Sequence, residues 1–295
     1  MNDRVPEEAA IEHHYQDNPQ VGNPGLILYQ WTDPLWAVCP MFGGDIVASE
    51  IQSRSNRITP PRFSSPANGS VKQRIAIIPV DGVLSKYGSL HDRWTSYLDL
   101  AEKVRSAGAS SQIDGIVLKV DSLGGHTKGL DTCANAIADI AKRKPVVSYV
   151  EDHCSSAAYW LASQANKVFV SNKTARVGGI GLYFGVYDLS KNYADRGIKP
   201  VLIRSGKFKG AGWPGTVITD EQKAEWQRQV DVVAAEFYRA VGRTRPVNRD
   251  RLEEITTGKD YLAGDAVKLG LVDGIRTLSA TIDAVRKGTN RTARN

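Results

Sequence analysis

The sequence contains no long apolar run and few cysteines. No stretch of about 18 consecutive apolar residues occurs, which argues against a membrane-spanning helix. The N-terminal stretch MNDRVPEEAAIEHHYQD is acidic and has no apolar segment, so we expect no secretory signal peptide. The three cysteines, Cys39, Cys133 and Cys154, are widely spaced and odd in number. That pattern favours reduced thiols in the cytoplasm over a disulfide framework or a zinc site.

Motifs for binding phosphate or nucleic acid are also missing. Neither GxxxxGK[ST] nor a GxGxxG after a strand occurs, and there is no finger, helix-turn-helix or aromatic–basic RNA pattern. The net charge of +6 is uneven: residues 1–25 hold five acids and one base, and residues 51–75 hold five bases and no acid. The last ten residues carry four bases, which are interpreted as a solvated tail in preference to a nucleic-acid contact. No cofactor or metal is expected.

Composition divides the chain into three parts. Residues 1–72 are predicted to be a leader and linker that is partly disordered, with the apolar and aromatic groups of residues 26–50 packing on another part of the protein. Residues 73–277 are predicted to form the main domain, and residues 278–295 the end of a C-terminal helix and a basic tail. Apolar residues make up 41% of the sequence and charged residues 24%, as in ordinary soluble globular proteins.

The main domain alternates predicted strands and helices. In the first predicted helix the apolar face consists of Leu90, Trp94, Leu98, Ala101 and Val104. A capping box, Thr219 to Gln222, opens the longest helix. The predicted strands are 74–84, 113–122, 146–151, 167–171 and 200–206, and the predicted helices are 90–108, 130–144, 157–165, 219–242 and a short one within 262–275. This alternation indicates an α/β fold with a mostly parallel sheet, whose working residues follow the carboxyl ends of strands.

Three segments of this domain could carry chemistry. VDSLGGHTKG (120–129) is either a plain tight turn or a loop whose glycine N–H groups bind an oxyanion. HCSSAAYWL (153–161) leaves Ser155 and Ser156 at a strand-to-helix step, where a hydroxyl serves as a helix cap or as a nucleophile. Cys154 is a further candidate nucleophile, or a buried thiol at the strand end. The third segment, RSGKFKGAGWPG (204–215), is rich in glycine and holds two lysines.

The positions of the histidines limit which residue could act as the general base. None of the five follows Ser156, so a Ser–His–Asp triad would need His126 or His153 from upstream. A Ser–Lys dyad needs no histidine. A lysine accepts a proton only as the neutral amine, which burial favours.

Together these segments resemble the signal peptide peptidase A family of serine–lysine proteases, which includes the phage prohead proteases of the lambda C type. SSAAYWLAS is similar to the family's nucleophile stretch, with Ser156 at the nucleophile position, and SGKFK matches S-G-x-x-K, with Lys209 as the general base and Lys207 as a spectator. LGG corresponds to the family's P-G-G loop, so the resemblance implies an oxyanion hole made by the N–H groups of Gly125 and Ala157. TARVGGIG and GLVDGI resemble further family segments, and the match runs from about residue 74 to residue 276.

The sequence departs from the family pattern at three places. Leu123 replaces a proline, and Ala157 and Ala158 replace the glycines after the nucleophile. Gly179 replaces the serine of T-G-S-I-G, so any role of that serine in orienting the lysine does not carry over. The related Clp proteases use a histidine about 25 residues after the serine, where this sequence has GGIG, and this excludes Clp-type chemistry.

The resemblance implies a Clp/crotonase-like layered fold and a serine endopeptidase that acts on polypeptides through an acyl-enzyme. It also implies a homo-oligomeric ring in which neighbouring subunits can share an active site. Gly124, Leu182, Tyr183 and Phe184 are the expected substrate contacts. With no signal or anchor in the sequence, we expect processing of phage head, scaffold or other intracellular proteins, in the cytoplasm or in a prohead there. Two alternatives stay open: a non-catalytic capsid or assembly component with this fold, and a crotonase-like acyl-transfer enzyme that uses coenzyme A.

Overall fold

The computed structural model describes residues 36–38, 62–63, 74–88, 94–247 and 251–292. All of them belong to one compact unit that comprises residues 34–295. The predictions of disorder in the leader and of a linker before the domain lie mostly outside the described residues. The limits proposed for the main domain therefore stay predictions.

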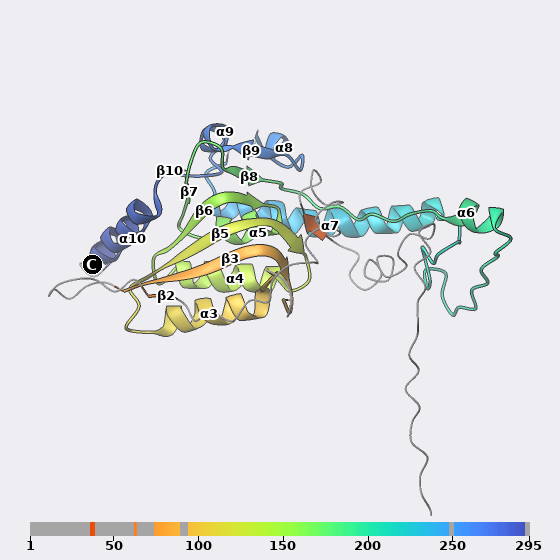
Figure 1. Cartoon of the computed structure of the whole chain (residues 1–295), viewed down its shortest axis with the longest axis horizontal. Helices are drawn as coiled ribbons and strands as arrows, with labels where there is room; N and C mark the ends of the chain where they lie inside the picture. The colour runs from red at the N-terminus through yellow and green to blue at the C-terminus, as the bar shows by residue number, and fades with distance from the viewer. Residues whose placement is uncertain (1–35, 39–61, 64–73, 89–93, 248–250, 293–295) are drawn as a thin grey trace, which may run out of the picture. The chain divides into compact units, whose positions relative to one another are not determined.

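A mostly parallel sheet forms the centre of the described structure (Figure 1). Its main path runs β10-β7-β6-β5-β3-β2, with β1 beside β5, β4 beside β3, β8 beside β6 and β9 beside β8. Within the described residues, only β1–β5, β2–β3 and β8–β9 pair antiparallel. The strands are β1 Trp36–Val38, β2 Arg62–Phe63, β3 Ile75–Ser85, β4 Trp94–Ser96, β5 Gly115–His126, β6 Val146–Ser155, β7 Lys167–Val170, β8 Arg176–Gly178, β9 Asp260–Leu262 and β10 Gly274–Ile275. The α/β prediction with a mostly parallel sheet is confirmed.

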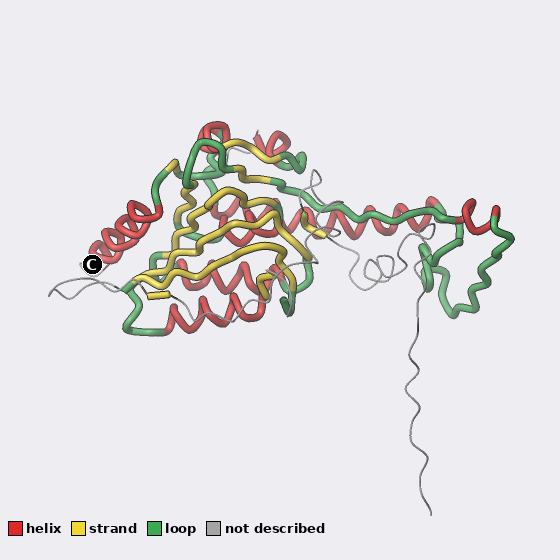
Figure 2. The backbone as a smooth tube through the Cα atoms, in the orientation of Figure 1, coloured by secondary structure: helices red, strands yellow, loops and turns green. Residues whose placement is uncertain are grey.

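Helices cover both faces of this sheet (Figure 2). Alternate residues of a strand point to opposite faces, so Ile116 and Leu118 of β5 join the large core with α3, α4 and α5. Val117 between them joins a smaller cluster that includes Val285 of α10. The helices are α3 Tyr97–Ala109, α4 Leu130–Ala141, α5 Ala157–Ser163, α6 Ser190–Asp195, α7 Asp220–Thr244, α8 Leu252–Ile255, α9 Ala263–Lys268 and α10 Leu278–Thr292.

The first predicted helix begins later than its apolar spacing indicates. Trp94 lies in β4, which pairs with the end of β3, and Ser96 caps α3 by accepting a hydrogen bond from the N–H of Asp99. The buried face of α3 then starts at Tyr97, whose hydroxyl donates to the carbonyl of His126 at 2.7 Å. Leu98, expected in the core, is 46% exposed, because the buried stripe is set by Tyr97, one residue earlier.

The long helix α7 is confirmed together with its capping box between Thr219 and Gln222. Its C-terminal half packs on α5, where the ring of Phe237 stacks on Trp160 with centroids 4.8 Å apart. Residues 183–219, here called the arm, begin beside its N-terminal half, where Phe184 meets Trp226 edge-on, and continue to α6 and a loop at the N-terminal end of α7 (Figure 1).

The strand predicted at 200–206 is wrong. These residues form no strand, and Val201 and Ile203 are 79% and 99% exposed. An apolar run becomes a strand only where another strand offers backbone partners, and the arm offers none to this segment.

Asp273 of the GLVDGI segment connects the C-terminal end of α7 to strand β7 through ion pairs and a hydrogen bond. The carboxylate of Asp273 pairs with Arg245 at 2.8 Å and with Lys167 at 2.8 Å, and it accepts the N–H of Val168. Burial raises the pKa of Asp273, but the hydrogen bonds from Lys167 and Val168 and the charge of Arg245 outweigh burial and leave the pKa below its ordinary value.

Candidate active site

Ser156 occupies a strained turn between β6 and α5. Its φ of 54° and ψ of −122° make it the only non-glycine residue with positive φ in the described part of the chain. Such a conformation costs on the order of 1–3 kcal/mol and persists where the surrounding structure enforces it. The enforcement is visible: the N–H of Ser156 donates to the carbonyl of Gly178 at 2.8 Å, and its carbonyl accepts from Trp160.

The hydroxyl of Ser156 has no structural role among the described residues. It is buried, it makes no hydrogen bond, and it does not cap α5. A buried hydroxyl without a partner costs about 1–3 kcal/mol. A serine that is both strained and unpartnered therefore points to a functional hydroxyl rather than a helix cap.

Of the two neighbouring candidates, Ser155 is already hydrogen-bonded and Cys154 carries an unreactive thiol. The hydroxyl of Ser155 donates to Oδ1 of Asp260 at 2.7 Å. Burial raises the pKa of the Cys154 thiol well above its ordinary value, with Asp260 and Asp121 adding to the effect, so the thiol stays protonated at neutral pH. Ser156 therefore differs from both neighbours, because its hydroxyl is neither hydrogen-bonded nor a buried thiol.

The LGG stretch belongs to β5 and is not a loop, which corrects the prediction for residues 120–126. Gly124 has φ of 109° and donates its N–H to Oγ of Ser122. A Cβ at Gly125 would lie 1.9 Å from the carbonyl oxygen of Leu84, so this position accepts only glycine without a shift of the strands. Gly124 and Gly125 thus mark a close approach of β3 and β5 at the strand end.

Lys209 makes no hydrogen bond to the Ser156 hydroxyl within one chain. It is exposed in the arm, and its neighbour Lys207 pairs with Glu221 in the first turn of α7. Trp160 in the middle of α5 stacks on Phe237, which lies 16 residues after Glu221, or about 24 Å further along the axis of α7. The helix that follows Ser156 and the lysine loop of the arm therefore contact different halves of α7.

No described histidine bonds to the Ser156 hydroxyl. The ring of His126 lies 6.0 Å from that of Trp94, and the N–H of His153 donates to Asp121. Among the described residues no group of three His, Cys, Asp or Glu side chains could hold a metal ion.

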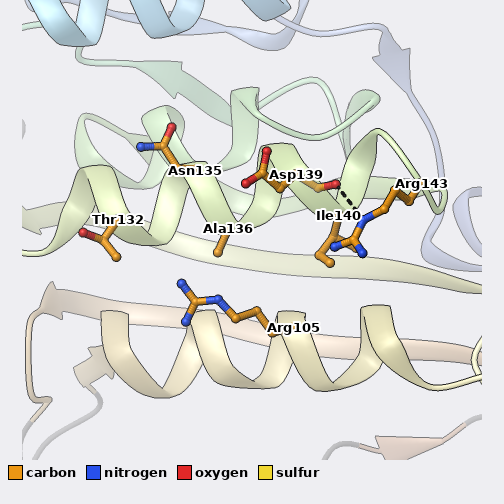
Figure 3. Close-up of a pocket in the computed structure, with 7 residues that line it drawn as sticks. All are labelled: Arg105, Thr132, Asn135, Ala136, Asp139, Ile140 and Arg143. Carbon is orange, nitrogen blue, oxygen red and sulfur yellow. Dashed lines mark hydrogen bonds between the residues drawn. The ribbon is translucent and has the colours of Figure 1, made fainter.

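A separate surface pocket lies between α3 and α4 (Figure 3). Arg105 projects from α3 toward α4, and none of the lining residues belongs to the strand ends or to the Ser156 turn. The lining residues are Arg105, Thr132, Asn135, Ala136, Asp139, Ile140 and Arg143. This pocket is not part of the site around Ser156.

The sequence profile of peptidase family S49 matches residues 138–291, which include the Ser156 turn, the arm and the Asp273 segment. The chain belongs to peptidase family S49. The predicted resemblance to the signal peptide peptidase A and prohead protease family is thereby confirmed.

Two relatives show how far the S49 similarity extends. A putative protease of Methanocaldococcus jannaschii is 31% identical over 65% of this chain and 59% of its own length. Capsid assembly protease C of Escherichia phage lambda is 28% identical over 73% of this chain and 49% of its own length. The chain spans about half the length of the curated relatives it matches. A solved enoyl-CoA hydratase/isomerase family member aligns with TM-score 0.41 and 16% identity over 78% of each chain.

The remaining predicted S49 site residues lie on the path from the sheet to the arm. Leu182 is half-buried against the core, Tyr183 is 36% exposed, and Phe184 packs on Trp226 rather than facing open space. Their role in substrate binding stays a prediction.

Sequence reasoning missed Asp260, which no motif links to Ser155 across 105 residues. No helix among the described residues is both long and apolar enough to span a bilayer.

Proposed function

We propose that the chain is a serine endopeptidase in which Ser156 is the nucleophile and Lys209 the general base. The observation that carries the proposal is the state of Ser156: strained, buried and free of structural hydrogen bonds, in a chain of family S49. The N–H groups of Gly125 and Ala157 hold the developing oxyanion. No cofactor enters this mechanism.

The reaction runs through an acyl-enzyme. Neutral Lys209 takes the hydroxyl proton of Ser156 as the oxygen attacks the scissile carbonyl, and the C–N bond breaks when Lys209 returns the proton to the leaving amine. Water then adds to the ester, and the acid product leaves. Loss of one oxyanion donor typically lowers the rate by about 10²–10³.

Lys209 comes from a neighbouring copy of the chain in this proposal. The separation along α7 supports it, and so do the exposed apolar side chains of the arm, which a second copy would cover. These side chains are Tyr187, Val201, Ile203, Trp213 and Val217. The same contact would bury Lys209 and favour its neutral form. The active unit is then a homo-oligomer, in line with the expected ring.

The substrate is a polypeptide, and its class is proposed from the relatives. Similarity to the phage lambda capsid assembly protease supports the processing of head or scaffold proteins, in the cytoplasm or in a prohead within it. The buried free thiols of Cys133 and Cys154 agree with a reducing compartment. Leu182 and Tyr183, with Gly124, are proposed to contact the substrate before the cut.

A second candidate function has one observation in its favour. The Ser156 hydroxyl has no hydrogen bond to Lys209 within one chain, as expected of a capsid or assembly component that keeps the fold without catalysis. The strained Ser156 turn favours the peptidase, because a non-catalytic chain gains nothing from that strain.

A peptidase assay on purified full-length protein separates the two. Ser156→Ala and Lys209→Met each lower kcat/KM by at least about 10³-fold. The matched control Lys207→Met, two residues away in the same loop, stays within about threefold because its exposed ion pair contributes little. Unchanged turnover in Ser156→Ala or in Lys209→Met rejects the dyad. If neither the unsubstituted chain nor any variant cleaves peptide, the non-catalytic assembly role is favoured.

A further inference from the structure

The end of β5 has one backbone edge that β6 does not use. Along one edge β5 pairs with β3, as far as Val83–Gly124 and Leu84–Gly125. Along the other it pairs with β6 only up to Ser122–Cys154, after which β6 runs into the Ser156 turn. From Leu123 onward the N–H and C=O groups on that second edge need another partner.

A short strand from the N-terminal part of the chain takes this edge. β1 pairs antiparallel with the last residues of β5, in the register Trp36–His126, Ala37–Gly125 and Val38–Gly124. Since β3 already holds the other edge of Gly124 and Gly125, β1 lies on the edge that β6 leaves. It therefore runs along the stretch that carries the proposed oxyanion donor Gly125.

A peptide substrate needs the same place. To present its carbonyl to Ser156 and to the N–H of Gly125, an extended peptide has to lie along the end of β5 on the side of the Ser156 turn. Strand addition to an open sheet edge is a common way to bind an extended peptide, because the main chain supplies the hydrogen bonds. In this fold that edge is occupied by the protein itself.

The burial of Ser156 agrees with a closed site. Its Oγ has essentially no exposed surface, so no peptide bond reaches it in the described arrangement. A nucleophile of this kind becomes accessible only when a neighbouring segment moves. The segment on the substrate edge is only three residues long and has three residue pairs with β5.

We propose that Trp36–Val38 is an internal, substrate-like strand that occupies the peptide-binding edge of Gly124–His126 and closes the site until it is displaced. This inference rests on the proposed peptidase function. Three residue pairs hold this strand on β5, and a closed state favoured roughly 10- to 100-fold over the open one weakens apparent peptide affinity by the same factor. An extended segment with apolar and small residues, such as Trp-Ala-Val, is the type of peptide that this edge accepts.

A matched pair of proline variants tests the strand in the full-length chain. In an antiparallel pair successive residues alternate between hydrogen-bonded and non-bonded positions, so of Trp36 and Ala37 one donates its N–H to β5 and the other does not. Trp36→Pro and Ala37→Pro are placed separately in the Ser156→Ala background, so that a bound peptide is not cut. The probe is a fluorescent peptide PLWAVSP, residues 34–40 with serine in place of cysteine, and binding is read by anisotropy.

We expect the proline that removes the pairing N–H to raise peptide affinity by about 10-fold or more, and the other proline to change it by less than about threefold. Equal, weak binding to both variants and to the parent overturns the inference. Thermal melting checks that each variant is folded. If one is not, hydrogen exchange on the unsubstituted chain decides, because exchange at residues 36–38 as fast as in a free peptide also overturns it.

The same two prolines with Ser156 retained separate this inference from the proposed function. Faster peptide hydrolysis in the variant that binds the probe supports both. Tighter probe binding without hydrolysis in any form upholds the internal strand and removes the peptidase. Hydrolysis in the parent chain that neither proline increases upholds the peptidase and removes the internal strand.

Discussion

The hydroxyl of Ser155 donates a 2.7 Å hydrogen bond to Oδ1 of Asp260, a residue 105 positions further along the chain. Asp260 lies in β9, which pairs with β8, and β8 pairs in turn with the end of β6. Gly179 packs closely against both residues, since a Cβ there would lie 3.2 Å from Oδ1 of Asp260 and 3.0 Å from the N of Ser156. The bond therefore fixes the residue that precedes the strained Ser156 and is proposed to position the nucleophile.

Substitutions at Asp260 test this positioning role. Asp260→Ala leaves the buried Ser155 hydroxyl without its acceptor, and we expect a loss of about 1–3 kcal/mol in the free energy of unfolding. It should also lower kcat more than it raises KM, because Ser156 shifts while the substrate edge stays. Asp260→Asn keeps an oxygen acceptor and should retain most of kcat. Equal losses of kcat in both variants would show that the charge of Asp260, not the hydrogen bond, is needed.

Mixing two inactive variants tests the shared site. Ser156→Ala retains the lysine, and Lys209→Met retains the serine. If each site combines Ser156 of one copy with Lys209 of the next, an equimolar mixture that exchanges subunits recovers roughly a quarter of the unsubstituted activity. The control is the double variant mixed with the unsubstituted chain. Full subunit exchange, followed by mass spectrometry, without recovered activity would place both groups in one chain.

Gly125 has a tight environment that an alanine does not fit. The added Cβ would lie 1.9 Å from the Leu84 carbonyl oxygen, so the end of β5 must move away from β3. We expect Gly125→Ala to lower kcat/KM at least about 10²-fold, the effect of one lost oxyanion donor. Gly242→Ala in α7 is the matched control, since nothing lies within 4 Å of its new Cβ. The control should keep full activity and gain about 0.5–1 kcal/mol from helix propensity.

Asp273 makes the stability of the fold pH-dependent in the acid range. Its folded-state pKa is depressed, so the unfolded chain binds the proton more readily. The stabilisation is complete above the unfolded pKa of about 3.9 and is lost as pH falls through the lower folded-state pKa.

Asp273→Asn should remove that acid dependence. It should also lower the free energy of unfolding at neutral pH by about 3–5 kcal/mol, because the buried Arg245 loses its only carboxylate partner among the described residues and keeps the Gly270 carbonyl as an uncharged acceptor. Urea unfolding at several pH values measures both effects. Asp265→Asn, which breaks only an exposed pair with Lys268, should cost less than about 1 kcal/mol. An unchanged acid dependence in Asp273→Asn would assign it to other carboxylates.

Patterns local in sequence predicted most of the elements well. The β5 and β6 runs, the α4 face with Leu130 and Ile137, and the capping box of α7 follow from periodicity and from hydrogen bonds within a few residues. The errors lie where distant partners decide. Ile203 is a residue type that favours strands, but no strand lies beside it to pair with its backbone. The strands β8 and β9 are too short for the sequence pattern to predict them before their pairing partners are known.

By itself the sequence determined that this is an α/β chain with a serine at a strand-to-helix step and a lysine 53 residues later, within the motif order of one peptidase family. The tertiary structure decided which serine hydroxyl lacks a hydrogen-bond partner, because the partner of Ser155 comes from β9. It placed the start of the arm against the N-terminal half of α7, whereas α5 packs on the C-terminal half. It also placed Trp36–Val38 on the edge of β5 next to the Ser156 turn. All three depend on backbone and side-chain contacts between segments far apart in the chain, and local periodicity contains no information about such contacts.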